Sequence, residues 1–278
     1  MQDEIKNELV AELLCVADTD WVLGHWYIKV MLNGRSLTDC SSFAGMGQEA
    51  LGHTRAIFKF LEDELDLPEH QLEFGRDRTH IHDMEMLSKP PENWGDFLVT
   101  TFLAEGAVWN MLSTFRSGSE PGISGMVTHF GKELYFHRLA IEGWLKSATD
   151  EDRVDMVEAA SHRVPLALRW FDTAERSDND DLLKTGVRSS SVNEAKTAFI
   201  ASTLVKLNET IELAEMPDAE FDEWDPVRRR TRDSGLPVTL WEFMIPSDPD
   251  TVKLRRPLAV SVDDNLDLFD RPEYAQDD

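Results

Sequence analysis

The sequence predicts an all-α protein: a four-helix bundle with additional helices and an extended C-terminal tail. Apolar residues recur at intervals of three and four from Ile5 to about Leu213, the spacing that places them on one face of a helix. No stretch shows the sustained alternation of apolar and polar residues that is typical of strands. After residue 215 the sequence becomes rich in proline and aspartate. We therefore expect a helical domain over residues 1–215 and an extended acidic tail, partly disordered, over residues 216–278.

Six helices follow from this periodicity. The first, with or without a break near Asp18–Asp20, ends at Asn33–Gly34, since glycine commonly follows the last turn of a helix. A charged connector that holds a short helix and closes with Pro90–Pro91 separates the second helix from the third. Pro165 lies inside the fifth helix, where we expect a kink. The six expected helices cover about 4–32, 38–64, 94–116, 123–147, 150–176 and 192–215.

Composition narrows the classes of function. Hydrophobic residues make up 41% of the 278 residues, enough for a substantial core. The 53 acidic residues outnumber the 28 basic ones, and a net charge of −25 argues against nucleic acid and anionic membranes as partners. Because the acids are spread along the chain, we favour halophilic adaptation to high salt over a dedicated acidic binding face. Two cysteines without metal-type spacing, and no apolar run long enough to span a bilayer, predict a cytoplasmic protein.

Two of the expected helices carry a glutamate four residues before a histidine. The pairs are Glu49 with His53 and Glu133 with His137. Residues four apart lie on the same face of a helix, so each pair can point into the interior of a bundle. Four-helix bundles that hold two metal ions use an acid from each of two helices and a Glu-x-x-His from each of the other two. The pattern therefore indicates either a metal centre or a cluster derived from one.

The other two bundle helices complete such a centre only in part. The third supplies Glu105, whereas residues 21–32 of the first contain no acid and offer only His25. By this count the site falls short of four carboxylates and two histidines. We therefore expect a buried cluster of hydrogen bonds and ion pairs in place of a metal centre, made by Glu49, His53, Glu105, Glu133, His137 and His25. The alternatives are a single divalent metal, or a working di-iron centre, held by Glu49, His53, Glu105, Glu133 and His137.

Three stretches resemble a known family in their order and spacing. They read DWVLGHWYIKVMLNGRSLTDC, LEFGRDRTHIHDMEMLSKPPENW and GKELYFHRLAIEGWLK. Over about residues 10–175 the chain resembles the phenylacetyl-CoA epoxidase family, a multicomponent ring oxygenase with two similar ferritin-like subunits. The resemblance implies a ferritin-like fold. In that family the A subunit holds a catalytic di-iron centre, whereas the C subunit is structural and lacks it.

The motif helices resemble the structural subunit more closely than the catalytic one. The A subunit carries its ligands as Glu-x-x-His, in segments that read QDEAGH and KEESFH, whereas this chain reads QEALGH and KELYFH. Its two histidines correspond to His53 and His137, but its ligand glutamates correspond to Ala50 and Leu134. The LDLLGQAR and KEARYH patterns of the C subunit are closer, and the register over residues 21–55 needs no gap.

The resemblance implies that the chain is a non-catalytic structural subunit of phenylacetyl-CoA epoxidase, in aerobic phenylacetate catabolism. It would be a component of the monooxygenase complex rather than an enzyme by itself. No cofactor is expected in this chain, because the di-iron centre belongs to the partner subunit. The expected partners are the homologous catalytic di-iron subunit, through residues 21–60, other epoxidase components and, through the partner, the CoA ester. The alternative is a ferritin-like metal-binding oxygenase or oxidase with a reduced ligand set.

Overall fold

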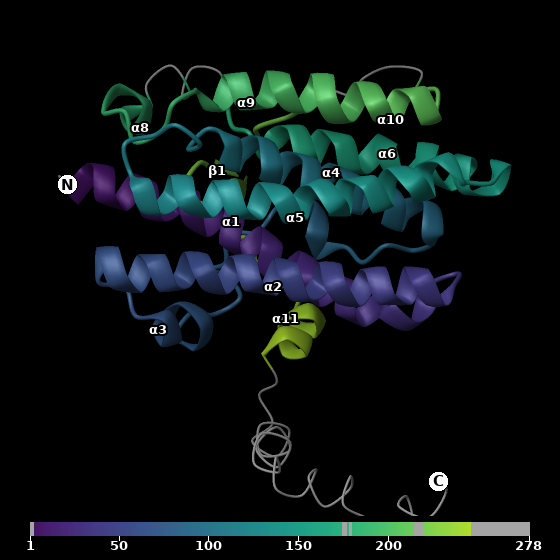
Figure 1. Cartoon of the computed structure of the whole chain (residues 1–278), viewed down its shortest axis with the longest axis horizontal. Coiled ribbons are helices and arrows are strands. Elements are labelled where there is room, and N and C mark those ends of the chain that lie inside the picture. The colour runs from purple at the N-terminus through teal and green to yellow at the C-terminus, as the bar shows by residue number, and fades with distance from the viewer. Residues whose placement is uncertain (1–2, 174–176, 178–179, 214–218, 246–278) are drawn as a thin grey trace, which may run out of the picture. The chain divides into compact units, whose positions relative to one another are not determined.

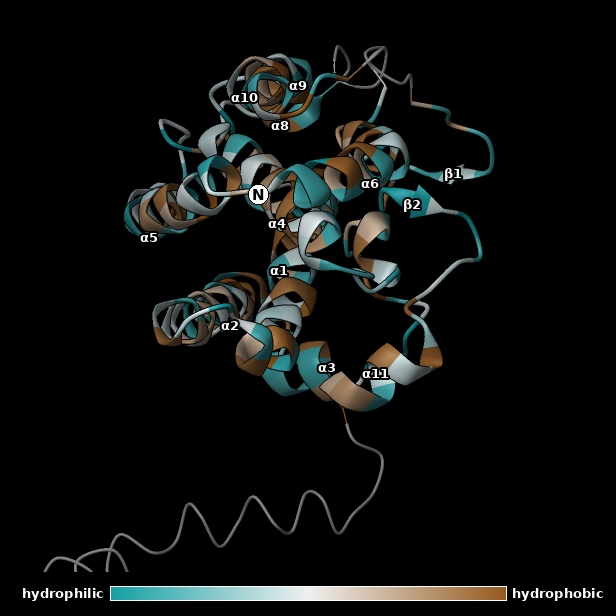
Figure 2. Cartoon of the chain, turned by 90° about the vertical axis from the view of Figure 1, so that its right-hand side faces the viewer, coloured by the Kyte–Doolittle hydropathy of each residue, from teal (hydrophilic) through white to brown (hydrophobic). Residues whose placement is uncertain are grey.

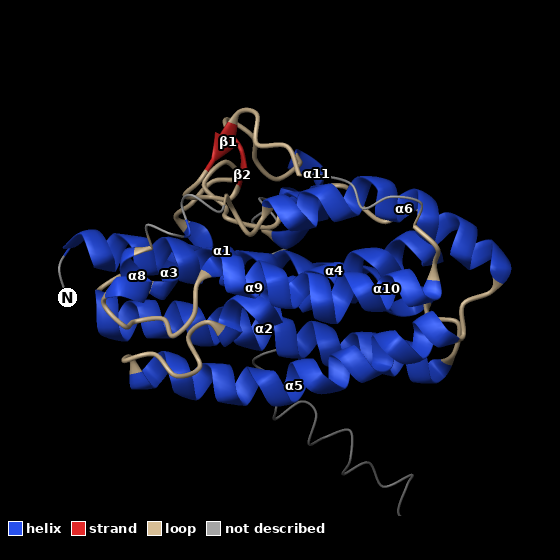
Figure 3. Ribbon diagram, turned by 90° about the horizontal axis from the view of Figure 1, so that it is seen from above, coloured by secondary structure: helices blue, strands red, loops and turns tan. Residues whose placement is uncertain are grey.

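The computed structural model describes residues 3–173, 177, 180–213 and 219–245, and these are mostly helical (Figure 1). The predicted all-α, ferritin-like fold is confirmed. A view from above shows the long helices lying side by side, with two short strands at one edge (Figure 3). The elements are α1 Asp3–Val30, η1 Met31–Asn33, α2 Leu37–Leu65, α3 Glu69–Phe74, η2 Glu85–Ser88, α4 Trp94–Ser113, α5 Pro121–Lys146, α6 Asp150–Arg169, α8 Asp181–Lys184, α9 Val192–Phe199, η3 Ile200–Leu204, α10 Val205–Thr210, β1 Trp224–Asp225, β2 Arg230–Thr231 and α11 Val238–Met244.

Polar side chains define where several helices begin. The side chains of Ser36 and Asn93, before α2 and α4, each accept a hydrogen bond from the backbone N–H three residues further on. Thr149 and Ser191 open α6 and α9 with capping boxes, in which the acid three residues later bonds back to the cap. These caps satisfy N–H groups that have no partner inside a helix. They account for helix starts that agree closely with those expected from the sequence.

The bundle consists of α1, α2, α4 and α5. α1 packs mainly against α2, and α4 packs against α1, α5, α6 and α9. Because α4 has neighbours on several sides, almost all of its length is buried. Figure 2 shows the hydrophobic sides of these helices facing one another in the interior. A polar side chain on α4 is therefore buried in the core of the bundle.

No helix within the described ranges is long and apolar enough to cross a membrane.

The region after residue 215 contains an ordered antiparallel ribbon. β1 pairs with β2 through Trp224 with Thr231 and Asp225 with Arg230. The chain divides into two compact units, Met1–Leu236 and Pro237–Asp278. Of the expected tail, residues 219–236 thus belong to the same unit as the bundle, and α11 is the described helix of the second unit. The expected disorder near the end of the tail concerns residues 246–278, which lie outside the described residues.

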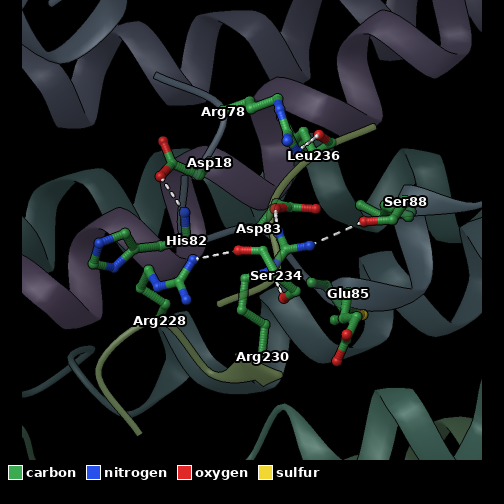
Figure 4. Close-up of polar contacts among 12 residues, drawn as sticks. Asp18, Arg78, His82, Asp83, Glu85, Ser88, Arg228, Arg230, Ser234 and Leu236 are labelled. Atoms are coloured by element: carbon green, nitrogen blue, oxygen red, sulfur yellow. Dashed lines mark hydrogen bonds and ion pairs between the residues drawn. The ribbon is translucent and has the colours of Figure 1, made fainter. Parts of the chain in front are cut away.

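Three successive arginines, Arg228 to Arg230, fasten this ribbon to the rest of its unit, and Figure 4 shows the first and the third of them. Arg230 forms an ion pair with Asp83, and Arg229 forms one with Glu12 of α1. Asp83 and Arg230 are 0% and 1% exposed, so their pair is fully removed from water. Burial raises the pKa of Asp83 to about 7, against the opposing effect of Arg230. All three arginines also donate further hydrogen bonds. Arg230 donates to the Ser88 hydroxyl, and Arg229 donates to the Trp170 carbonyl. Arg228 donates to the carbonyls of Thr79 and Ser234.

Replacing Arg230 with alanine should lower the free energy of unfolding by about 3–5 kcal/mol, because Asp83 would remain buried without its cation. Urea denaturation in high salt measures this loss. Arg232→Ala, on the same ribbon but exposed, is the control and should stay within about 0.5 kcal/mol of the unsubstituted protein. The double change Arg230→Met with Asp83→Leu should recover most of the loss. Equal effects of Arg230→Ala and Arg232→Ala would contradict the role given to the buried pair.

Candidate functional site

Four helices bring two histidines and four carboxylates together inside the bundle. α2 contributes Glu49 and His53, and α5 contributes Glu133 and His137. α4 contributes Glu105, and α1 contributes an acid that the sequence analysis did not select, Asp20. Both histidines, Asp20 and Glu105 are at most 5% exposed, whereas Glu49 and Glu133 are partly accessible to solvent.

His53 lies between two of these carboxylates. Its Nδ1 is 3.2 Å from Asp20 Oδ2, and its Nε2 is 2.8 Å from Glu133 Oε2. Burial acts to lower the pKa of His53, but the two carboxylates outweigh it and raise the pKa. Burial also raises the pKa of Asp20, against the opposing effect of His53. A protonated imidazole that donates from both nitrogens is the form this geometry stabilises.

His137 repeats the arrangement with the other two carboxylates. Its Nδ1 is 2.9 Å from Glu105 Oε1, and its Nε2 is 2.6 Å from Glu49 Oε2. Tyr27 of α1 donates a further hydrogen bond of 2.8 Å to the same Oε1 of Glu105. Burial alone would lower the pKa of His137, but Glu105 and Glu49 raise it to about 9. His137 is therefore a cation at neutral pH.

The two triads, Asp20–His53–Glu133 and Glu105–His137–Glu49, connect α2 and α5 reciprocally. The histidine of α2 bonds the glutamate of α5, and the histidine of α5 bonds the glutamate of α2. The pairing order shows that α2 and α5 run antiparallel. It also explains why glutamate and histidine are four residues apart on each helix. The glutamate bonds the histidine of the other helix and lies one turn away from the histidine of its own helix.

The expected cluster is brought together, with one exception and one addition. Glu49, His53, Glu105, Glu133 and His137 meet as described, whereas His25 lies outside both triads. The Nδ1 atom of His25 donates to the carbonyl oxygen of Trp21 at 2.8 Å, within its own helix.

Asp20 takes the place in α1 that was considered for His25. Asp20 directly precedes residues 21–32, which contain no acid, and a break in the helix near Asp18–Asp20 was left open as an alternative. α1 is in fact continuous there, because both acids are paired: Asp18 with Arg76, at 2.7 Å, and Asp20 with His53.

A cleft of about 440 Å³ opens over the triads between α2 and α5. Gly45 and Gly52 of α2 leave it open, since a side-chain carbon built on either would meet no atom within 4 Å. Glu49 and Glu133 lie at its floor, and His129 and Phe130 form part of the α5 side. Solvent therefore reaches the outer carboxylate of each triad, and the inner carboxylates stay buried.

The donor set fits a two-metal centre by count but not by arrangement. Four carboxylates and two histidines from four helices are the side chains such bundles use for two metals. A histidine ligand, however, must be neutral with a free nitrogen lone pair, and here all four ring nitrogens bond carboxylates. Within the described part of the chain, no group of three or more His, Cys, Asp or Glu side chains is arranged to hold a metal ion. As arranged, the residues form a cluster of ion pairs and hydrogen bonds.

Comparison with known proteins identifies a family whose model matches this chain. A family model described as phenylacetic acid catabolic protein matches residues 1–229, most of the chain and all four helices of the bundle. No curated protein matches the chain. The match supports a role in phenylacetate catabolism.

Protonation of His137 should make stability depend on pH. Because its folded pKa is raised to about 9, its contribution is complete below the unfolded pKa of about 6.5 and is lost as pH rises through 9. The free energy of unfolding should therefore fall by up to about 3 kcal/mol between these pH values. Urea denaturation across this window measures the slope, to which His53 adds in the same direction.

His137→Gln tests the assignment. The variant should be less stable at pH about 6.5 and should lose most of the slope between about 6.5 and 9, because glutamine does not titrate. His162→Gln, at an exposed position of α6, should leave the slope as it is. A variant at residue 137 that keeps the full slope would show that other groups produce it.

Proposed function

The chain belongs to the phenylacetic acid catabolic protein family, and we propose that it is the structural, non-catalytic subunit of a multicomponent phenylacetyl-CoA epoxidase in the cytoplasm. In this proposal a homologous subunit holds the di-iron centre and carries out the ring oxidation. The present chain supports that subunit through a helix-on-helix interface and binds no cofactor of its own. Within the complex the chain also meets other epoxidase components, and it meets the CoA ester through the catalytic subunit.

The proposal depends on one observation: both nitrogens of both inward histidines are used by carboxylates of the same chain. The resemblance places the ligand glutamates of the catalytic subunit at Ala50 and Leu134, three residues before each histidine. Both of these side chains are buried and neither can bind a metal. The acids one residue earlier, Glu49 and Glu133, instead cross to the histidine of the opposite helix. In this proposal the ionic cluster takes the position that the resemblance gives to the metal centre of the catalytic subunit.

A second candidate function is a ferritin-like oxygenase or oxidase with its own metal. The observation in its favour is Asp20, which completes the number of carboxylates that a two-metal centre uses. In this alternative the triads would have to open and both histidines would have to lose a proton. We favour the structural subunit because the observed cluster is already closed by its own hydrogen bonds.

The proposed interface is the end of the bundle where α1 turns into α2. Three large apolar side chains are exposed there: Ile28 at 43%, Leu32 at 84% and Leu37 at 87%. They fall within residues 21–60, the stretch through which the resemblance implies contact with the catalytic subunit. Exposed apolar side chains that gather at one place are typical of a surface that a partner covers. The catalytic homologue is the partner that the family relationship suggests.

Metal content tests the non-catalytic assignment. After anaerobic incubation with Fe(II) and desalting, elemental mass spectrometry should find far less than one iron per chain in the unsubstituted protein. The double variant Ala50→Glu with Leu134→Glu restores Glu-x-x-His on both helices and should bind about two metal ions per chain, with a higher melting temperature when metal is added. Gln48→Glu, an exposed acid on the same helix, is the control. About two irons in the unsubstituted chain would establish the oxygenase alternative.

Co-purification tests the partner. The chain should elute together with its catalytic homologue when both are expressed in one host. Leu32→Arg or Leu37→Arg should weaken this association about tenfold or more, because a charge would enter the centre of an apolar interface. Val154→Arg, on α6 and 69% exposed, is the control. Association that survives both leucine changes would place the interface elsewhere, and absence of any association would count against the structural-subunit role.

A further inference from the structure

A second cavity, of about 130 Å³, lies between α4, α5 and the π-helical turn η3. Its wall is mainly apolar, with Phe102 and Trp109 from α4 and Leu134 and Ile141 from α5. Two polar side chains lie at its outer edge. Tyr135 is 59% exposed, and Arg138 is partly exposed. The cleft between α2 and α5 shares none of these residues.

Two close contacts and an irregular helical turn shape this cavity. A side-chain carbon at Gly131 would lie 2.6 Å from the Trp109 ring, and one at Gly106 would lie 2.4 Å from Thr203 Oγ1. The two glycines thus allow the indole ring and the turn η3 to approach the helix backbones. η3 interrupts the helix formed by α9 and α10, and π-helical turns of this kind are frequent at functional sites. Arg138 fixes the turn by donating a 2.7 Å hydrogen bond to the carbonyl of Ser202.

One buried polar atom at the cavity lacks a partner. Glu105 forms part of the wall and is 5% exposed. Its Oε1 accepts hydrogen bonds from His137 and Tyr27, but its Oε2 has no hydrogen-bond partner among the described residues. A buried carboxylate oxygen left without a donor is costly, and such atoms are rare in folded proteins. A molecule in the cavity could supply the missing donor.

We propose that this cavity binds a small, neutral, ring-sized apolar molecule that donates one hydrogen bond to Glu105 Oε2, in the manner of a phenol or an aromatic alcohol. The volume supports the size, because an apolar protein cavity of about 150 Å³ accommodates benzene. An anionic group such as an aryl carboxylate cannot supply this bond, because it carries no proton to donate to Glu105 Oε2. A divalent metal ion is disfavoured, because it requires several oxygen ligands and the wall supplies one carboxylate. This ligand site goes beyond the structural role proposed above and does not depend on it.

Isothermal titration calorimetry of the full chain with phenol and with toluene tests the proposal. The two probes have similar size, but only phenol donates a hydrogen bond. Phenol should bind at least about tenfold more tightly than toluene, since a hydrogen bond to a charged acceptor is a strong one. Glu105→Gln removes the charge, so the preference for phenol should shrink to a few-fold or less. Failure of phenol to bind, or equal binding of both probes, would overturn the proposal.

A pair of matched variants locates the binding site without changing the charged cluster. Leu134→Phe adds volume to the wall and should abolish phenol binding while the chain remains folded, as judged by circular dichroism. Leu139→Phe makes the same change on the same helix at a side chain that is 48% exposed and outside the cavity, and it should bind phenol like the unsubstituted protein. If a folded Leu134→Phe variant binds phenol with unchanged affinity, the molecule lies elsewhere and the assignment of this cavity is wrong.

Discussion

The bundle depends on the neutralisation of charge in its interior. Asp20 of α1 and Glu105 of α4 lie in the core, and an isolated buried carboxylate is strongly unfavourable. The two histidines resolve this, since each lies between an inner and an outer carboxylate that raise the pKa of its imidazole. The same bonds hold α2 to α5, whose direct packing is much less extensive than that of α1 on α2. Charge pairing here supplies the cohesion that apolar contacts supply elsewhere in the bundle.

Arginine has the corresponding role for the buried acids outside the triads. Four of the buried acids outside the triads are met by a guanidinium from a segment distant in sequence: Glu12 by Arg188 and Arg229, Asp18 by Arg76, Asp83 by Arg230 and Asp96 by Arg163. The planar guanidinium can bond two oxygens at once, as Arg76 does with Asp18 and Arg163 with Asp96. In a chain with few basic residues, many of the arginines are thus used internally. The acidic excess is left to the surface.

The sequence was sufficient to predict the fold because each long helix carries its own periodic apolar face, and α2, α4 and α6 each begin at a side-chain cap. The helix beginning at Trp94 was expected to end near 116 and ends at Ser113, whereas the fifth ends at Arg169 rather than near 176. The site could be predicted where one helix carries both a glutamate and a histidine four residues apart, as α2 does with Glu49 and His53. Asp20 and the arginine triplet could not be, because their partners lie tens to hundreds of residues away. The π-helical turn has no signal in the sequence, since its extra residue is accommodated by contacts with α4.

The ribbon has a consequence for how the protein is made. Arg229 bonds Glu12 across 217 residues of sequence, and Arg230 bonds Asp83 across 147. During synthesis the helices of the bundle leave the ribosome well before these arginines do, at about 5–20 residues per second. For several seconds or more, the nascent bundle therefore contains Asp83 without its cation and Glu12 with only one of its two, Arg188. Completion of the core is a late event, controlled by a segment that contributes almost no helix, so a chain cut short before residue 230 contains the whole bundle but not its final charge balance.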